Sequence, residues 1–191
     1  MGDIFILSNL EEWKVKNGYK VRKWLNDMGE IEALISLSTI AFEHDEWTYP
    51  TISGVNEIEA IELAHPLLGE KAKSNNFTLK GSEKVVLITG SNMSGKSTFL
   101  RTIGFNMILT YLGLPTFSKG FKCGISNIYT CMRTQDNLEE NISSFYAEIL
   151  RIKLVIEAAK RGEKVFFLLD EIFKGTNSKD RHDGARILIE Q

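Results

Sequence analysis

A short glycine-framed loop carries the residue types and the spacing that phosphate binding requires. Residues 90–97 read GSNMSGKS, which matches Gly, four residues of any type, Gly, Lys, and then Ser or Thr. Glycines are needed because the backbone N–H groups of such a loop wrap around phosphate oxygens in conformations that side chains obstruct. Lys96 is expected to reach the β- and γ-phosphates, and Ser97 to offer its hydroxyl to Mg²⁺. ATP and Mg²⁺ are therefore the predicted cofactors.

The predicted nucleotide contacts extend through the whole loop and into the residue after it. An ordinary glycine turn is the alternative, but an apolar run precedes this loop and a helical pattern follows it, which is the context that a phosphate loop requires. Thr98 is expected to start the helix and to approach the α-phosphate. The residues predicted to bind the nucleotide are Gly90, Ser91, Asn92, Met93, Ser94, Gly95, Lys96, Ser97 and Thr98.

Two adjacent carboxylates, Asp170 and Glu171, follow a second apolar run at residues 165–169. At the C-terminal end of a buried strand, Asp170 can hold the Mg²⁺ shell together with Ser97, partly through water. A carboxylate one residue further along can act on the attacking water as general base, so Glu171 and Lys96 are the predicted catalytic residues. The alternative is that the pair only ends a strand at the surface. Its combination with the phosphate loop favours a hydrolytic site.

The elements that would position these residues indicate an α/β fold. An apolar run rich in β-branched residues at 85–88 is typical of a buried parallel strand that leads into the loop. Apolar periodicity predicts helices over 96–114 and 144–161. We expect strands joined by polar turns over 120–133, and another buried strand over 165–169. This order of elements predicts a sheet with parallel central strands.

The N-terminal part of the sequence is typical of a helical arm. Apolar residues at helical spacing predict one long helix over 19–42, preceded by a shorter amphipathic piece over 7–15 with a break at Asn17 and Gly18. Residues 45–66 are predicted to form a loop with short strands, because two prolines push the residues before them towards extended geometry. We divide the chain into a helical arm at 1–45, a connector that begins the ATPase domain at 46–83 and the core of that domain at 84–191.

Composition and charge exclude several classes of protein. Apolar residues make up 43% and charged residues 25%, as in soluble globular chains, so neither disorder nor a fibrous repeat is indicated. A net charge of −2 argues against a basic DNA-binding face on this chain. Cys123 and Cys131 lack zinc-site spacing and are expected to be buried, reduced thiols. The absence of a leader pattern and of an uninterrupted apolar stretch of membrane length predicts a cytoplasmic protein with no membrane contact.

Two of these segments resemble the MutS family of DNA mismatch-repair proteins. The loop region TGSNMSGKSTFLR, at 89–101, resembles the family's loop, which carries Asn and Met inside the glycine frame. The region LLDEIFKGTNSKD, at 168–180, resembles the family's Asp-Glu-Ile segment and the Gly-Thr pair that follows it. A His-Pro pair at 65–66 and Asn75 match further landmarks, so the resemblance covers roughly residues 30–183.

A serine-containing element between these two segments carries the same resemblance. Ser143, Ser144 and Phe145, with Glu148, resemble the family's Ser-Thr-Phe element. The resemblance implies that Ser143 contacts the γ-phosphate bound by the opposite subunit. The alternative is that Ser143 or Ser144 only caps a helix, and both interpretations are compatible because a helix N-terminus is itself an anion site.

The resemblance implies a P-loop NTPase of the ABC-ATPase type, with a mostly parallel central sheet preceded by a short helical arm. It also implies the ATP-binding and hydrolysing domain of a MutS-like DNA mismatch-repair or DNA-processing protein. The implied partner is a second copy of the domain in a nucleotide-dependent homodimer. DNA would be bound through regions absent from this chain, which we interpret as a fragment with slow Mg²⁺-dependent ATP hydrolysis.

Departures from the family pattern leave some questions open. Lys174 and Asn177 stand where the common pattern has Arg and Ser or Thr, which suggests a divergent branch. Ala72 stands where relatives often stack an aromatic on adenine, so the adenine contact stays open, and Phe77 is expected in the core. The alternative functions are another ABC-superfamily ATPase or a non-hydrolysing, ATP-dependent dimerisation module. A small-metabolite kinase is disfavoured because no Arg-rich lid follows the loop helix.

Overall fold

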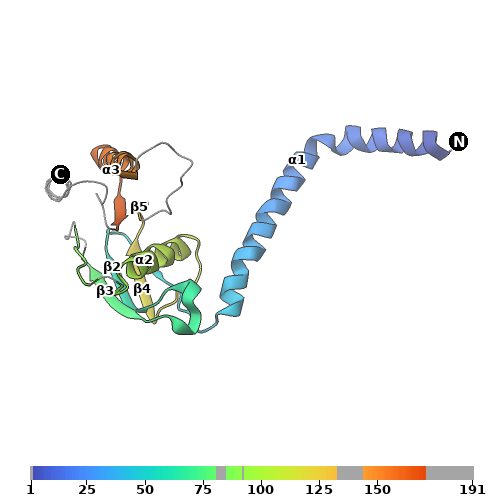
Figure 1. Ribbon diagram of the computed structural model, residues 1–191. Helices are drawn as coiled ribbons and strands as arrows, with labels where there is room; N and C mark the ends of the chain where they lie inside the picture. The colour runs from blue at the N-terminus through green and yellow to red at the C-terminus, as the bar shows by residue number, and fades with distance from the viewer. Residues whose placement is uncertain (1, 81–84, 92, 133–143, 171–191) are drawn as a thin grey trace. The chain divides into compact units, whose positions relative to one another are not determined.

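The computed structural model describes residues 2–80, 85–91, 93–132 and 144–170 of the 191-residue chain. The chain divides into two compact units, Met1–Asp45 and Glu46–Gln191, and each is described by itself. The first unit is a helix, and the described residues of the second form strands, two further α-helices and a 3₁₀ helix (Figure 1). Every residue of the candidate site that the structure describes lies in the second unit.

The first unit is one continuous helix, α1 (Gly2–Glu43), so the predicted break at Asn17 and Gly18 is wrong. The Asn17 side chain donates a hydrogen bond to the carbonyl of Trp13, 3.2 Å away, within the helix. A single glycine costs an isolated helix only about 1 kcal/mol, which the flanking turns tolerate. No residue of α1 is buried, and Trp24 is 42% exposed. Across the described residues, no helix is both long enough and apolar enough to span a membrane.

Four short strands of the second unit form a mixed sheet. The strands are β1 (Thr51–Ser53), β2 (Ile58–Leu63), β3 (Asn75–Leu79) and β4 (Gly120–Gly124), in the order β1-β4-β2-β3. Strand β1 runs parallel to β4, whereas β2 is antiparallel to both β3 and β4. A 3₁₀ helix, η1 (Pro66–Lys71), connects β2 to β3. The predicted short strands of the connector are confirmed, but this sheet is not plainly parallel.

A second, smaller sheet and two helices complete the described part. Strand β5 (Asn127–Cys131) pairs in parallel with β6 (Val165–Leu169), while α2 (Lys96–Tyr111) and α3 (Ser144–Lys160) are the helices. The predictions of helices after the loop and before β6, of strands over 120–133 and of a strand over 165–169 are confirmed. The smaller sheet, formed by β5 and β6, is therefore parallel.

The strand predicted at residues 85–88 is not formed, which corrects the sequence prediction. Val85 is 41% exposed and Leu87 is 79% exposed, and the segment belongs to neither sheet. Val85, Val86 and Ile88 line a cavity of about 90 Å³ together with residues 165–168 of β6. An apolar β-branched run makes a segment compatible with a strand, but only a paired neighbour satisfies its backbone groups.

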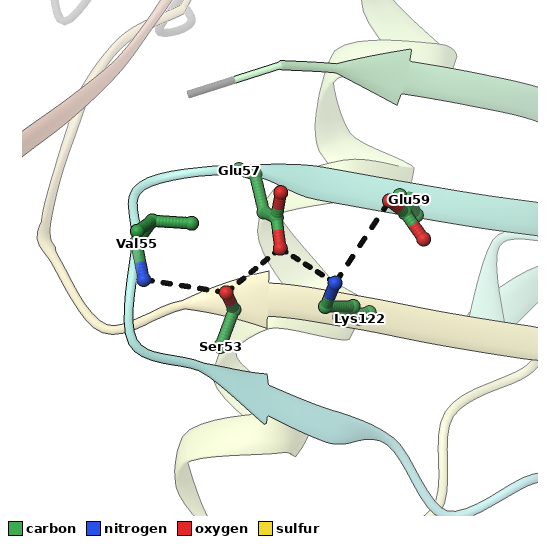
Figure 2. A network of polar contacts seen from close by, with 5 residues as sticks. All are labelled: Ser53, Val55, Glu57, Glu59 and Lys122. Carbon is green, nitrogen blue, oxygen red and sulfur yellow. Dashed lines mark hydrogen bonds and ion pairs between the residues drawn. The ribbon is translucent and has the colours of Figure 1, made fainter. Parts of the chain in front are cut away.

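An ion-pair network fastens the turn between β1 and β2 to β4 (Figure 2). The Lys122 ammonium lies 2.6 Å from a carboxylate oxygen of Glu57 and 3.9 Å from one of Glu59. The Ser53 hydroxyl donates to the same Glu57 oxygen at 2.8 Å. The hydrogen bond from Lys122 is the main cause that lowers the pKa of Glu57. A Cβ at Gly124 would overlap the carbonyl oxygen of Val55, so this glycine permits the turn to approach β4.

The hydrophobic core of the second unit joins the mixed sheet, α2 and β6 into one cluster. Ile58 and Leu63 of β2, Ile103 and Met107 of α2, and Leu168 of β6 are buried within it. Phe77 packs against the cluster, as predicted, and its ring meets the ring edge of Phe99 at a centroid distance of 5.5 Å. Cys123 and Cys131 are free and buried, which confirms the prediction of buried thiols. Burial raises the pKa of the Cys123 thiol to about 11.

Candidate phosphate-binding site

The lysine of the glycine-framed loop lies folded over the loop itself. The Lys96 ammonium donates one hydrogen bond to the carbonyl of Gly90, at 2.9 Å, and another to that of Ser91, at 2.6 Å. The Ser94 N–H donates to the Ser91 carbonyl at 3.3 Å and closes the turn between them. The structure therefore brings Gly90, Ser91, Ser94 and Lys96 together.

Two left-handed residues shape the turn. Met93 has a φ of 65° and Gly95 a φ of 91°. Left-handed residues in a turn point successive N–H groups inwards, and such concave sets of N–H groups bind anions. The left-handed conformation costs roughly 1–2 kcal/mol for a residue with a Cβ, so Met93 is strained whereas Gly95 is not. Gly90 is constrained differently, because a Cβ there would lie 3.0 Å from the Ser94 hydroxyl oxygen.

Helix α2 begins directly at the loop. Gly95 is its N-cap and has no side chain to accept from the first N–H groups, while its carbonyl accepts from Phe99 N–H at 2.8 Å. The unpaired N–H groups of a first turn and the helix dipole both favour an anion at this end. Ser97 is half-buried in this first turn and Thr98 is exposed. Both residues lie in the first turn of α2, and their predicted contacts with Mg²⁺ and the α-phosphate stay predictions.

The first of the two predicted carboxylates stands at the end of β6. The Asp170 N–H donates to the carbonyl of Cys131 at 2.9 Å, so the pairing of β5 with β6 continues one step past the strand. Asp170 is partly exposed. An acidic residue at the carboxyl end of a parallel strand lies at the edge where ligands bind in open α/β sheets.

Three residues of the prediction lie outside the described residues. They are Asn92 of the loop, Glu171 after β6 and Ser143 before α3, so their roles remain predictions. The departures Lys174 and Asn177 also lie there.

A hydroxyl and a carboxylate are the oxygen donors that Mg²⁺ prefers, and Ser97 and Asp170 supply them. Among the residues that the structure describes, no group of three or more His, Cys, Asp or Glu side chains gathers into a metal cage. Mg²⁺ is usually held by one or two carboxylates and the substrate phosphates rather than by a dedicated protein cage. The residues present therefore fit a magnesium ion that arrives with a nucleotide.

Asn106 is a buried polar residue of the helix that carries Lys96, and the sequence analysis above does not single it out. Its side chain is completely buried in α2. The amide nitrogen donates to the carbonyl of Ala64 at 3.1 Å and to that of Thr102 at 2.8 Å, while the amide oxygen accepts from Phe117 N–H at 3.0 Å. A polar residue at a helical position that should be apolar was the signal, because a buried amide is retained only where it is hydrogen-bonded.

The His-Pro landmark is structural in this chain. His65 caps η1, since its Nδ1 accepts from Leu67 N–H at 3.2 Å. Its ring lies 5.2 Å from that of Phe105 on α2. Burial is the main cause that lowers the pKa of His65, and the Arg101 charge lowers it further. The landmark therefore fixes the start of η1 against the helix that carries Lys96.

The structure thus places a glycine-framed loop at the N-terminus of α2 and an acidic residue directly after β6. Residues 86–190, more than half of the chain, match the family model described as MutS domain V. The chain therefore belongs to the MutS family.

The relatives of the chain carry the same family name. The chain is 29% identical over 189 residues to the endonuclease MutS2 of Carboxydothermus hydrogenoformans. This match covers 97% of the chain and 24% of the relative. The chain is 33% identical to the DNA mismatch repair protein MutS of Persephonella marina, over 84% of this chain and 19% of the relative. The chain is also 33% identical to the DNA mismatch repair protein MutS of Bacillus velezensis, and the match covers 90% of this chain and 20% of the relative. The chain thus spans about a quarter or less of the relatives that it matches.

Proposed function

We propose that this chain is the ATP-binding and ATP-hydrolysing domain of a MutS-like protein that acts on DNA as a nucleotide-dependent dimer. The observation that carries the proposal is the Lys96 ammonium held over the carbonyls of Gly90 and Ser91 at the start of α2. We further propose the P-loop NTPase fold of the ABC-ATPase type. The parallel pairing of β5 with β6 supports this fold.

The described residues support distinct roles in the reaction. Loop N–H groups and the α2 N-terminus would bind the phosphates, and Lys96 would neutralise charge on the β- and γ-phosphates. Ser97 and Asp170 would hold Mg²⁺, which supplies charge neutralisation for phosphoryl transfer when bound. Glu171 would accept the proton of the attacking water.

The dimer and the DNA role rest on the family. Ser143 would complete the γ-phosphate site of the opposite subunit, so binding and hydrolysis would couple to the association of two copies. The chain spans a quarter or less of the length of its relatives. We therefore propose that other regions of the protein bind DNA. The substitutions Lys174 and Asn177 support a divergent branch of the family.

Replacement of the loop lysine tests the proposal. Lys96→Ala should abolish Mg²⁺–ATP binding, measured by titration with a fluorescent ATP analogue, because it removes the charge that the phosphates require. Lys119→Ala, at an exposed lysine of the same unit, is the matched control and should bind as the parent chain does. Equal ATP affinity of the two variants would overturn the assignment of the loop.

A non-hydrolysing dimerisation module is the second candidate. It would share the phosphate loop and would release no phosphate. The steady-state release of phosphate from ATP in the presence of Mg²⁺, absent in Lys96→Ala, would decide for hydrolysis.

A further inference from the structure

The faces of α2 and β6 that bear the proposed magnesium ligands are the faces that meet in the core. Ser97 and Gly104 are seven residues apart on α2, which is close to two full turns, so they lie along one face of the helix. Leu168 and Asp170 are two residues apart, so they lie on one face of the strand and its extension.

The contact between these faces occurs at a position without a side chain. A Cβ placed on Gly104 would lie 2.9 Å from the terminal methyl Cδ1 of Leu168. Both residues are buried, and Leu168 is only 4% exposed. Ile103, Met107 and Phe166 belong to the same core cluster as Leu168, and Ile103, Phe166 and Leu168 also line the cavity of about 90 Å³ described above.

Gly104 does not lie at an open position of its helix where any side chain would fit. At Gly29, in α1, a Cβ would meet nothing within 4 Å, whereas at Gly104 it would press on Leu168. Glycine in a helix interior is unfavourable relative to alanine, so Gly104 carries a cost that the close approach of helix and strand offsets.

We propose that Gly104 is a positioning residue that sets the separation of α2 and β6, and through it the separation of the Ser97 hydroxyl from the Asp170 carboxylate. This inference rests on the proposed function, because it assigns both groups to Mg²⁺. A larger side chain pushes Leu168 away from the helix, and β6 carries Asp170 with it. The loop contacts lie within residues 90–96, from the Lys96 ammonium to the Gly90 and Ser91 carbonyls and from Ser94 N–H to the Ser91 carbonyl, so they do not depend on this separation.

The test separates nucleotide binding from its dependence on Mg²⁺. Binding of a fluorescent ATP analogue is measured in EDTA and then across a titration of Mg²⁺. Gly104→Val should leave the affinity for the ATP analogue in EDTA within about twofold of that of the parent chain. It should raise the Mg²⁺ concentration that gives half of the effect on binding roughly tenfold, because misplacing the metal ligands by an ångström or less has effects of this size. Gly104→Ala should shift it in the same direction by less, because the end of a flexible leucine side chain can partly yield.

Rescue distinguishes positioning from general damage to the fold. The double variant Gly104→Val, Leu168→Ala restores the combined volume at the contact and should return the Mg²⁺ dependence towards that of the parent. Leu168→Ala alone should not raise the Mg²⁺ requirement as Gly104→Val does. Gly29→Val, at the open position of α1, is the matched control. It should change neither the affinity in EDTA nor the Mg²⁺ dependence of binding.

Two outcomes would overturn the inference. An unchanged Mg²⁺ dependence in the Gly104→Ala and Gly104→Val variants would do so, and so would a double variant that is no closer to the parent than Gly104→Val. If Gly104→Val lost its helical circular dichroism, Gly104→Ala and its Mg²⁺ titration would decide alone. Failure of the parent chain to bind the analogue at all would instead count against the proposed function.

Discussion

At the scale of single residues, the candidate site depends on the charge of Lys96. Among the described residues, the Lys96 ammonium donates to the carbonyl oxygens of Gly90 and Ser91, which carry no formal charge. These bonds fix where the ammonium points and leave its charge to attract an anion. Met93 shows the cost of the loop shape, because it holds a left-handed φ of 65° with its side chain fully exposed.

The general base is the residue-scale prediction that separates binding from hydrolysis. Glu171→Gln should keep ATP affinity and slow steady-state phosphate release by roughly 10²-fold or more, because it removes the proton acceptor and leaves the loop intact. Glu30→Gln, the same change at an exposed position of α1, should leave both quantities unaltered. Turnover equal to that of the parent would show that another group orients the water.

At the scale of elements, α2 is the part that organises the site. Its N-terminus carries Lys96 and Ser97, its middle packs on β6, and Asn106 ties it to two other segments of the chain. The His65 ring packs against the same helix through Phe105. Interactions so distributed along one helix hold its N-terminus in place relative to both sheets.

Removal of the buried amide tests this role of α2. Asn106→Ala leaves the Ala64 carbonyl and the Phe117 N–H without their side-chain partner, which should lower the free energy of unfolding by about 2–4 kcal/mol in urea titrations. Asn127→Ala removes an exposed hydrogen bond to Glu163 and should cost less than about 1 kcal/mol. Equal losses in the two variants would contradict the proposed tie.

At the scale of the whole molecule, the question is whether one copy suffices for the reaction. The described residues supply the loop, Ser97 and Asp170 from a single chain. The proposed contact of Ser143 with the γ-phosphate comes from the second copy, so a lone copy would have an incomplete set of groups for the transition-state charge. Association and turnover should then rise together.

A dilution series of the purified 191-residue chain tests this coupling. ATPase activity per molecule should be low in dilute solution and increase with protein concentration, and Ser143→Ala should flatten that dependence. Ser36→Ala, at an exposed serine of α1, is the control and should follow the parent. A specific rate that is high at every concentration and insensitive to Ser143→Ala would favour a self-contained site.

The sequence by itself determined the features that depend on neighbouring residues. The GSNMSGKS spacing located the loop, and apolar periodicity located the helix from Lys96, the helix from Ser144 and the strand at 165–169. Such patterns are readable because backbone geometry repeats every few residues. The carboxylate after that strand was found for the same reason, since its position follows from the end of the apolar run.

Only the tertiary structure decided the features that depend on residues far apart in the chain. The run at 85–88 has the composition of a strand, yet whether it pairs depends on a neighbour and not on its own residues. The approach of Gly104 to Leu168 joins positions 64 residues apart, and Asn106 bonds across 42 residues to Ala64. Packing and hydrogen bonding between distant segments leave no local periodicity, so these contacts could be assigned only from coordinates.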